Sequence, residues 1–159
     1  MAGPCITVGV RVPLFDRLVA TAAAGEMSGA GHDRRMLDRA GLKASIGREL
    51  ERLLNTRSPL AVEALSKRPR STLDYGLPDL SRFWPANTES EAELARLIER
   101  TVMAFEPRLH KPRVSVERIP GRQRALRAVV AGSIALDNMV EPVSFPVAID
   151  DSAERQADE

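Results

Sequence analysis

One short stretch of this sequence brings together a carboxylate, a proline and an arginine, at Glu106, Pro107 and Arg108. A carboxylate and a guanidinium two residues apart can form an ion pair, and an arginine fork can also bind the carboxylates or carbonyl groups of a partner. Pro107 lacks a backbone N–H and disfavours helical backbone at the preceding residue, so a helix that reaches Glu106 must end there. The spacing permits two interpretations: a helix end with a surface ion pair, which is the commoner case, or a rigid recognition corner.

Carboxylates could also perform hydrolysis, and the pairs to consider are Glu106 with Asp74 or Glu106 with Asp79. A glycosidase needs one carboxyl group with a raised pKa, in a cleft that binds the sugar. Arg108 lies two residues from Glu106, and a neighbouring cation lowers the pKa of a carboxyl group. Aromatic residues, which stack against sugars, make up only 4% of the chain. These points disfavour a muramidase, and we expect no catalytic residues and no enzymatic activity.

Composition and missing motifs narrow the other functional classes. The sequence has no glycine-rich phosphate loop, no cysteine pair, no H-E-x-x-H and no G-x-S-x-G, so we expect no cofactor and no bound metal. The 23 Lys and Arg residues nearly balance the 22 Asp and Glu residues, which argues against a nucleic-acid partner. Cys5 is the single cysteine and cannot form an intrachain disulfide. We find no apolar run of about 20 residues and no signal-peptide pattern, so we expect a cytoplasmic protein without membrane insertion.

Basic residues are concentrated between positions 108 and 127. They are Arg108, His110, Lys111, Arg113, Arg118, Arg122, Arg124 and Arg127. The simplest interpretation is a solvated face on and around strands, and the alternative is a surface for an acidic protein partner.

The element that delivers the Glu-Pro-Arg corner is a predicted amphipathic helix that begins at Ser90 and ends at Glu106. Ser90 can cap the first backbone N–H groups, and Glu93 can reach back to the Ser90 N–H. The apolar residues follow a period near ~3.6 and predict one buried stripe. They are Leu94, Leu97, Ile98, Val102 and Phe105.

A second predicted helix runs from Leu42 to Leu54, with Asn55 as a left-handed terminator. Its stripe consists of Leu42, Ile46, Leu50, Leu53 and Leu54. The following segment, 71–80, has the residues of a turn but also four large apolar ones, so we expect it to pack on the core or to form a contact surface. Those four are Leu73, Tyr75, Leu77 and Leu80. Gly76 is expected to adopt a backbone angle that other residues resist.

After the corner the apolar period changes from 3.6 to 2, which predicts strands near 113–119, 124–134 and 143–149. Pro142 and Pro146 have the same parity, so both missing N–H groups face the same side and indicate a protected sheet edge. The other edge, at Val114 and Val116, is expected to stay open to an added strand.

These elements predict an α+β fold in which N-terminal helices pack on one face of a small antiparallel β-meander. We divide the chain into a flexible N-terminal segment, an α+β domain and a polar acidic tail. Their bounds are 1–41, with a short docking motif at 11–19, then 42–150 and 151–159.

Four sequence motifs occur in a fixed order. They are Val12-Pro-Leu-Phe-Asp-Arg-Leu18, Leu50-x-x-Leu-Leu-Asn-Thr-Arg57, Leu73-Asp-Tyr-Gly-Leu-Pro-Asp-Leu80 and Phe105-Glu-Pro-Arg-Leu109. Together with the three-strand pattern, they closely resemble the TssE family of type VI secretion baseplate subunits, which is related to the phage tail baseplate wedge protein. The resemblance covers roughly residues 10 to 149. Members of the family are often labelled lysozyme-like, but the family is regarded as structural.

The resemblance implies a non-catalytic subunit of a cytoplasmic baseplate, docked near the bacterial inner membrane, with TssF, TssG and TssK as its wedge partners. The sheet edge would pair with the sheath subunits TssB and TssC and prime sheath assembly. The resemblance also favours the recognition interpretation of the Glu-Pro-Arg corner. The residues that we expect to bind partners are Glu106, Pro107, Arg108, Leu109, Tyr75, Leu77, Leu14, Phe15 and Leu18. The alternatives are a peptidoglycan-cleaving muramidase and a wedge protein of another phage-like contractile particle.

Overall fold

The computed structural model describes most of the chain. The described residues are 10–11, 36–65, 69–83, 88–119, 125–136 and 139–150. The predicted partner-binding residues Leu14, Phe15 and Leu18 lie outside them, as does the predicted tail, 151–159.

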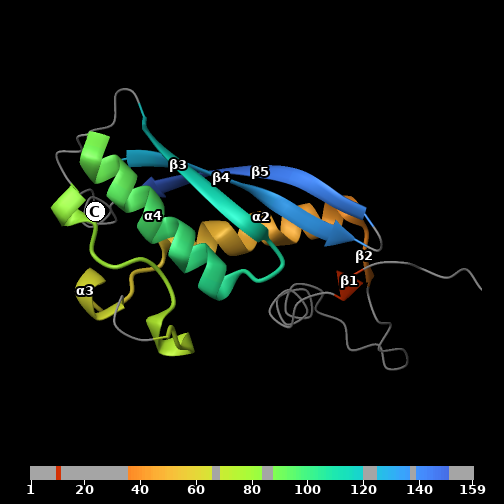
Figure 1. Cartoon of the computed structure of the whole chain (residues 1–159). Helices are drawn as coiled ribbons and strands as arrows, with labels where there is room; N and C mark the ends of the chain where they lie inside the picture. The colour runs from red at the N-terminus through yellow and green to blue at the C-terminus, as the bar shows by residue number, and fades with distance from the viewer. Residues whose placement is uncertain are drawn as a thin grey trace, which may run out of the picture.

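The described elements form an α+β fold, as predicted (Figure 1). A two-residue strand β1 (Val10–Arg11) pairs antiparallel with β2 (Met36–Leu37). The other elements are α2 (Arg39–Asn55), α3 (Val62–Leu65), the 3₁₀ helices η1 (Thr72–Asp74) and η2 (Ser81–Phe83), α4 (Thr88–Phe105), β3 (His110–Arg118), β4 (Ala125–Leu136) and β5 (Met139–Asp150). No helix in the described part of the chain is long and apolar enough to cross a membrane.

Helix α2 begins three residues before the predicted start, because Asp38 caps it by accepting the Gly41 N–H at 2.7 Å. All five residues of its predicted apolar stripe are buried. The prediction that Asn55 terminates the helix in a left-handed conformation is wrong: among the described residues only Lys111 and Gly76 have positive φ. The Asn55 side-chain amide instead donates to Glu51 O at 2.9 Å and to Ala148 O of β5 at 3.0 Å, which ties the helix end to the sheet.

Helix α4 begins at Thr88, so Ser90 lies in its first turn rather than at the predicted cap position. The helix ends at Phe105, in agreement with the stop predicted from Pro107. Four residues of its predicted stripe are buried, and Phe105 packs against the core from a partly buried position.

The sheet has the order β3-β4-β5 with both pairs antiparallel, which confirms the predicted meander and makes β5 an edge strand. Helix α4 contacts β3 and α2 contacts β5, and the inward side chains of the strands complete the core between them. Glu141 of β5 accepts from Arg39 and from Lys43 of α2, the latter at 2.7 Å, and so fastens the helix to this edge.

Of the four large apolar residues in the segment 71–80, Tyr75, Leu77 and Leu80 pack on the core, as predicted, whereas Leu73 is 83% exposed. Gly76 has φ 102°, and a Cβ atom there would lie 2.5 Å from Thr56 O. Only glycine allows this close approach, which also brings the Leu77 N–H to Thr56 O at 2.9 Å. The loop is therefore fixed against the end of α2.

Candidate functional site

The Glu-Pro-Arg corner follows directly from the end of α4. The Glu106 N–H donates to Val102 O at 2.8 Å, which continues the helical pattern by one bond past Phe105. Pro107 then prevents further helix, and the Leu109 N–H turns back to Glu106 O at 3.2 Å. The result is a tight turn that leaves Pro107 exposed and buries Glu106 and Leu109.

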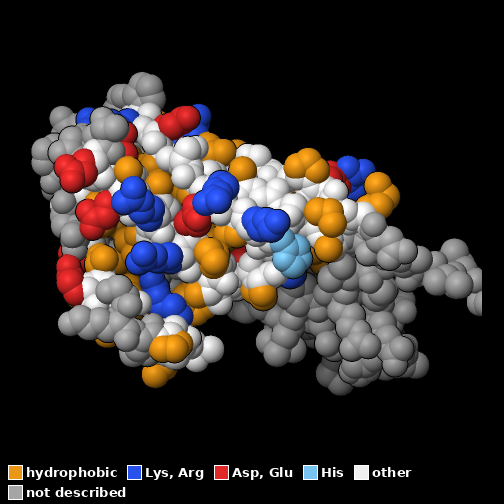
Figure 2. Space-filling view, in the orientation of Figure 1, with side chains coloured by type: hydrophobic (Ala, Val, Ile, Leu, Met, Phe, Trp, Pro, Cys, Tyr) orange, Lys and Arg blue, Asp and Glu red, His pale blue; other side chains and the backbone are white. Residues whose placement is uncertain are grey.

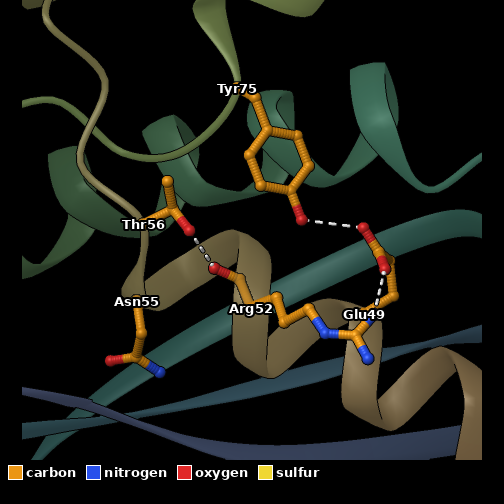
Figure 3. A pocket seen from close by; sticks show the side chains of 5 residues that line it. All are labelled: Glu49, Arg52, Asn55, Thr56 and Tyr75. Atoms are coloured by element: carbon orange, nitrogen blue, oxygen red, sulfur yellow. Dashed lines mark hydrogen bonds and ion pairs between the residues drawn. The ribbon is translucent and has the colours of Figure 1, made fainter. Parts of the chain in front are cut away.

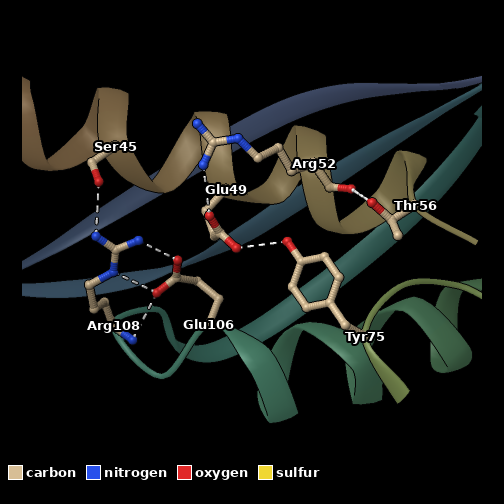
Figure 4. Close-up of polar contacts among 7 residues, drawn as sticks. All are labelled: Ser45, Glu49, Arg52, Thr56, Tyr75, Glu106 and Arg108. Carbon is tan, nitrogen blue, oxygen red and sulfur yellow. Dashed lines mark hydrogen bonds and ion pairs between the residues drawn. The ribbon is translucent and has the colours of Figure 1, made fainter. Parts of the chain in front are cut away.

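Arg108 and Glu106 form a bidentate ion pair inside this turn (Figure 4). Arg108 Nε donates to Glu106 Oε1 at 2.8 Å and Nη2 donates to Oε2 at 2.6 Å, while the Arg108 backbone N–H reaches Oε1 at 3.2 Å. The glutamate side chain is 1% exposed and that of the arginine 23%. A buried carboxylate with this many donors holds the guanidinium in one orientation, so neither simple interpretation of the corner is complete: the pair is not on the surface, yet its arginine reaches the surface.

Ser45 of α2 joins the ion pair of Glu106 and Arg108 as a third hydrogen-bonding residue. Its hydroxyl accepts from Arg108 Nη1 at 3.0 Å and is itself buried. Ser45 begins a polar stripe on α2 that also includes Glu49, Arg52 and Thr56 and lies beside the apolar stripe of the same helix (Figure 4). The sequence contained this signal, because steps of four, three and four place these residues on one helix face. A polar stripe on a helix usually faces solvent, so the spacing alone does not indicate a site.

Glu49 connects the stripe to the loop after η1. Its carboxylate accepts from the Tyr75 hydroxyl at 2.7 Å and from Arg52 Nη1 at 3.2 Å. Burial raises the pKa of the Tyr75 phenol, and the hydrogen bond to Glu49 raises that pKa further. The Tyr75 ring meets Phe105 edge-to-face, with ring centroids 5.4 Å apart. Through this contact the last residue of α4 and the loop hold each other in place.

A pocket of about 510 Å³ lies next to this network. Its lining residues are Glu49, Arg52, Asn55, Thr56 and Tyr75, all from the end of α2 and the loop after η1 (Figure 3). The Thr56 hydroxyl donates to Arg52 O at 2.7 Å. Among the lining residues, Glu49, Arg52 and Tyr75 thus hold one another, while the Asn55 amide is held by the carbonyl groups of Glu51 and Ala148.

The structure brings some of the predicted partner-binding residues together and separates others. Pro107 is exposed, Arg108 and Tyr75 are half-buried and Glu106 is buried, and the ring contact with Phe105 places Tyr75 at the end of α4, where the corner begins. Leu77 and Leu109 belong to the hydrophobic core, because they are 0% and 3% exposed. We therefore assign these two leucines to the packing beneath the corner and not to the contact surface.

The carboxylates considered for hydrolysis are all engaged in other interactions. Asp74 is buried and accepts from the Ser71 N–H at 2.8 Å and from its hydroxyl at 3.0 Å. Hydrogen bonds from the Ser81 hydroxyl and N–H lower the pKa of Asp79, which is the opposite of what a general acid needs. In the described ranges, no group of three His, Cys, Asp or Glu residues could hold a metal ion.

Comparison with known proteins points to a single family. The model of the family described as "Baseplate wedge protein gp25" matches residues 40–139. A solved structure titled "The baseplate complex from the type VI secretion system" contains a chain that is 18% identical, with a TM-score of 0.49 over 69% of this chain and 94% of that one. A putative tail lysozyme from Geobacter sulfurreducens is 18% identical, with a TM-score of 0.42 over 75% and 99% of the two chains. Among curated proteins, none matches.

Proposed function

The chain belongs to the baseplate wedge protein gp25 family, and from this premise we propose that it links the wedge complex of a type VI secretion baseplate to the contractile sheath and primes sheath assembly. We place this structural role in the cytoplasm, without catalysis. The engaged states of Glu106, Asp74 and Asp79 support a non-catalytic role, because a muramidase needs a carboxyl group that is free to give up a proton.

The observation that carries the proposal is the way in which Arg108 is held. Glu106 and Ser45 fix three of its nitrogens from below, while Arg108 and Pro107 reach the surface. A preorganised fork loses little side-chain entropy on binding a carboxylate or carbonyl group. We propose that this corner docks on the helical core of the wedge, formed by TssF and TssG with TssK.

The second proposed contact is the free edge of β3, for the sheath subunits TssB and TssC. In antiparallel pairs, backbone groups alternate between the two sides of a strand. Ile119 donates its N–H to Ala125 O of β4 at 3.2 Å. The backbone N–H and C=O groups of the odd-numbered residues 115 and 117 therefore point toward β4, and those of Val114, Val116 and Arg118 point to the open edge. The opposite edge is blocked by Pro142, Pro146 and the Asn55 contact to Ala148.

Co-purification from the native cytoplasm tests the wedge contact. We expect the tagged wild-type chain to bring down the wedge subunits and Arg108→Ala to lose them. Arg118→Ala is the matched control, because it removes an exposed arginine that also pairs with a glutamate, Glu91 at 3.3 Å. Equal recovery by Arg108→Ala and Arg118→Ala would refute the corner assignment. A wild-type chain that comes down alone and clears peptidoglycan would refute the structural role.

A further inference from the structure

The sheet has a second face, opposite α2 and α4, that the proposed function does not use. In β5 the even-numbered residues from 140 to 148 are exposed, while the odd-numbered ones from 141 to 149 are buried or half-buried, and the register gives their partners on β4. We call the β4–β5 part of this face the outer patch. It consists of Val129, Ala131, Ser133 and Ala135 of β4 and Val140, Pro142, Ser144, Pro146 and Ala148 of β5.

None of the nine residues of the outer patch is charged, and the exposed Arg127, which is paired with Ala148, lies on the same face at one end of the patch. Surfaces of soluble domains carry roughly 25–35% charged residues, so about two or three of these nine positions would be charged on an ordinary solvated face. Figure 2 shows the middle of the surface above β3 mostly in white and orange, with blue and red side chains over α4 and β3 and at both ends of this region. Small and apolar side chains on a flat sheet face are typical of a face that another element covers.

The dimensions of the outer patch indicate what covers it. Two strands are about 10 Å wide, and the patch is six residue steps long on β4 and eight on β5, or about 20–27 Å. These dimensions match one α-helix of about 13–18 residues with a diameter of 10–12 Å. The corresponding footprint, roughly 200–270 Å², is that of one helix. A helix from a subunit already tethered elsewhere fits this footprint and gains from its high effective concentration.

Charge sets the orientation of that helix. On the same face, β3 places His110 beside Ser133 and Arg113 beside Ala131. Arg113 is 83% exposed and pairs with Glu99 at 3.3 Å. The uncharged strip is thus bordered on the first half of β3 by the charge of the exposed Arg113, which favours a partner with acidic residues on that flank.

We propose that the outer patch binds an amphipathic helix of a neighbouring subunit. The apolar stripe of that helix lies along β4 and β5, and its Asp or Glu flank lies beside His110 and Arg113. The inference rests on the proposed function in one respect, namely that the neighbour is a baseplate subunit.

Photo-crosslinking in cells tests the inference directly. The photoreactive residue p-benzoylphenylalanine replaces Ser144, at the centre of the outer patch, and the crosslinked partner peptide is identified by mass spectrometry. We expect a peptide with apolar residues at helical spacing and acidic residues on one flank. No adduct, an adduct to a second copy of this chain, or a peptide with alternating apolar residues would overturn the inference. The same probe at Ala44, exposed on α2, is the control, and capture of the same peptide there would also overturn it.

A charge reversal tests the border. Arg113→Glu should lower the Ser144 adduct yield about fivefold, because like charges across an interface repel. Arg96→Glu is the control, since Arg96 is exposed on α4, on the other side of the sheet from the outer patch, and this variant should stay within about twofold of wild type. Equal adduct yields for the two variants would overturn the prediction that the partner helix has an acidic flank.

A third probe, at the exposed Pro107, separates this inference from the proposed function. Baseplate capture at Pro107 without a helical peptide at Ser144 refutes the outer-patch inference alone. A helical acidic peptide at Ser144 without capture at Pro107 refutes the corner and leaves the outer patch as a binding site.

Discussion

At the scale of single residues, the Glu106 side chain holds Arg108 in place, which is the basis of its proposed role in recognition and predicts a contribution to stability. Its carboxylate is buried and holds Arg108 by two side-chain bonds. Removing one partner of a buried pair leaves the other uncompensated, at a cost of about 3–5 kcal/mol. Because Arg108 still reaches water, we expect Glu106→Gln to lower the free energy of unfolding by about 3 kcal/mol, the low end of that range.

Chemical denaturation of matched variants measures this cost. Glu99→Gln is the control, since it breaks an exposed pair with Arg113 that is worth about 0–1 kcal/mol. Equal stability of the two variants would show that the carboxylate of Glu106 is not buried as described.

Tyr75 offers a spectroscopic test of the polar network, because it is the only tyrosine in the chain. Burial and the Glu49 hydrogen bond raise the pKa of its phenol in the folded state. The unfolded chain then ionises first as the pH rises past about 10, so the stability that Tyr75 contributes is present below that pH and is lost above it. Phenolate absorbance should appear at a higher pH in the native protein than in urea, and Glu49→Gln should narrow the difference between the two titration midpoints. Coincident titrations of the folded and unfolded chains would contradict the network.

At the scale of elements, the sequence predicted the parts whose signal is periodic. The stripes of α2 and α4 and the alternation of β5 follow from burial on one side, and the structure confirms them. The ends of the helices were less predictable, because several neighbouring residues can cap the same helix end. Asp38 caps α2, and the Asn55 side chain bonds to β5 while its backbone does not adopt the left-handed conformation.

Glu141 of β5 and its two partners on α2, Arg39 and Lys43, form a clamp between helix and sheet, and this clamp predicts that stability falls in acid. Hydrogen bonds from Arg39 and Lys43, together with the charges of the two side chains, lower the pKa of Glu141 to about 2. A carboxyl group with a depressed folded-state pKa stabilises the fold above its ordinary pKa, near 4.5, and this stability is lost as the pH falls toward about 2. Glu141→Gln should therefore flatten the dependence of stability on pH in this window, as followed by thermal melting. If the difference in melting temperature between wild type and Glu141→Gln stays constant from neutral pH to about 2, the clamp is contradicted.

At the scale of the whole molecule, the site is a product of topology. Ser45 and Glu49 come from α2, Tyr75 from the loop after η1, and Arg108 from the end of α4 (Figure 4). Sequence order gives no distance between such positions, so the corner was predictable only as a local motif. Its buried support depends on how α2 and α4 pack.

The two edges of the sheet give the last prediction, because they differ in what they offer a partner. The backbone N–H of Val116 points to the open edge, whereas the backbone N–H of Ser115 points toward β4. Proline at an outward position leaves the ladder intact, and at an inward position it removes a bond. We expect Val116→Pro to fold but to weaken binding of purified sheath subunits about tenfold, since an added strand depends on main-chain bonds. Ser115→Pro should instead lower the melting temperature. Sheath binding that survives Val116→Pro in a folded protein would place the sheath contact elsewhere than on the β3 edge.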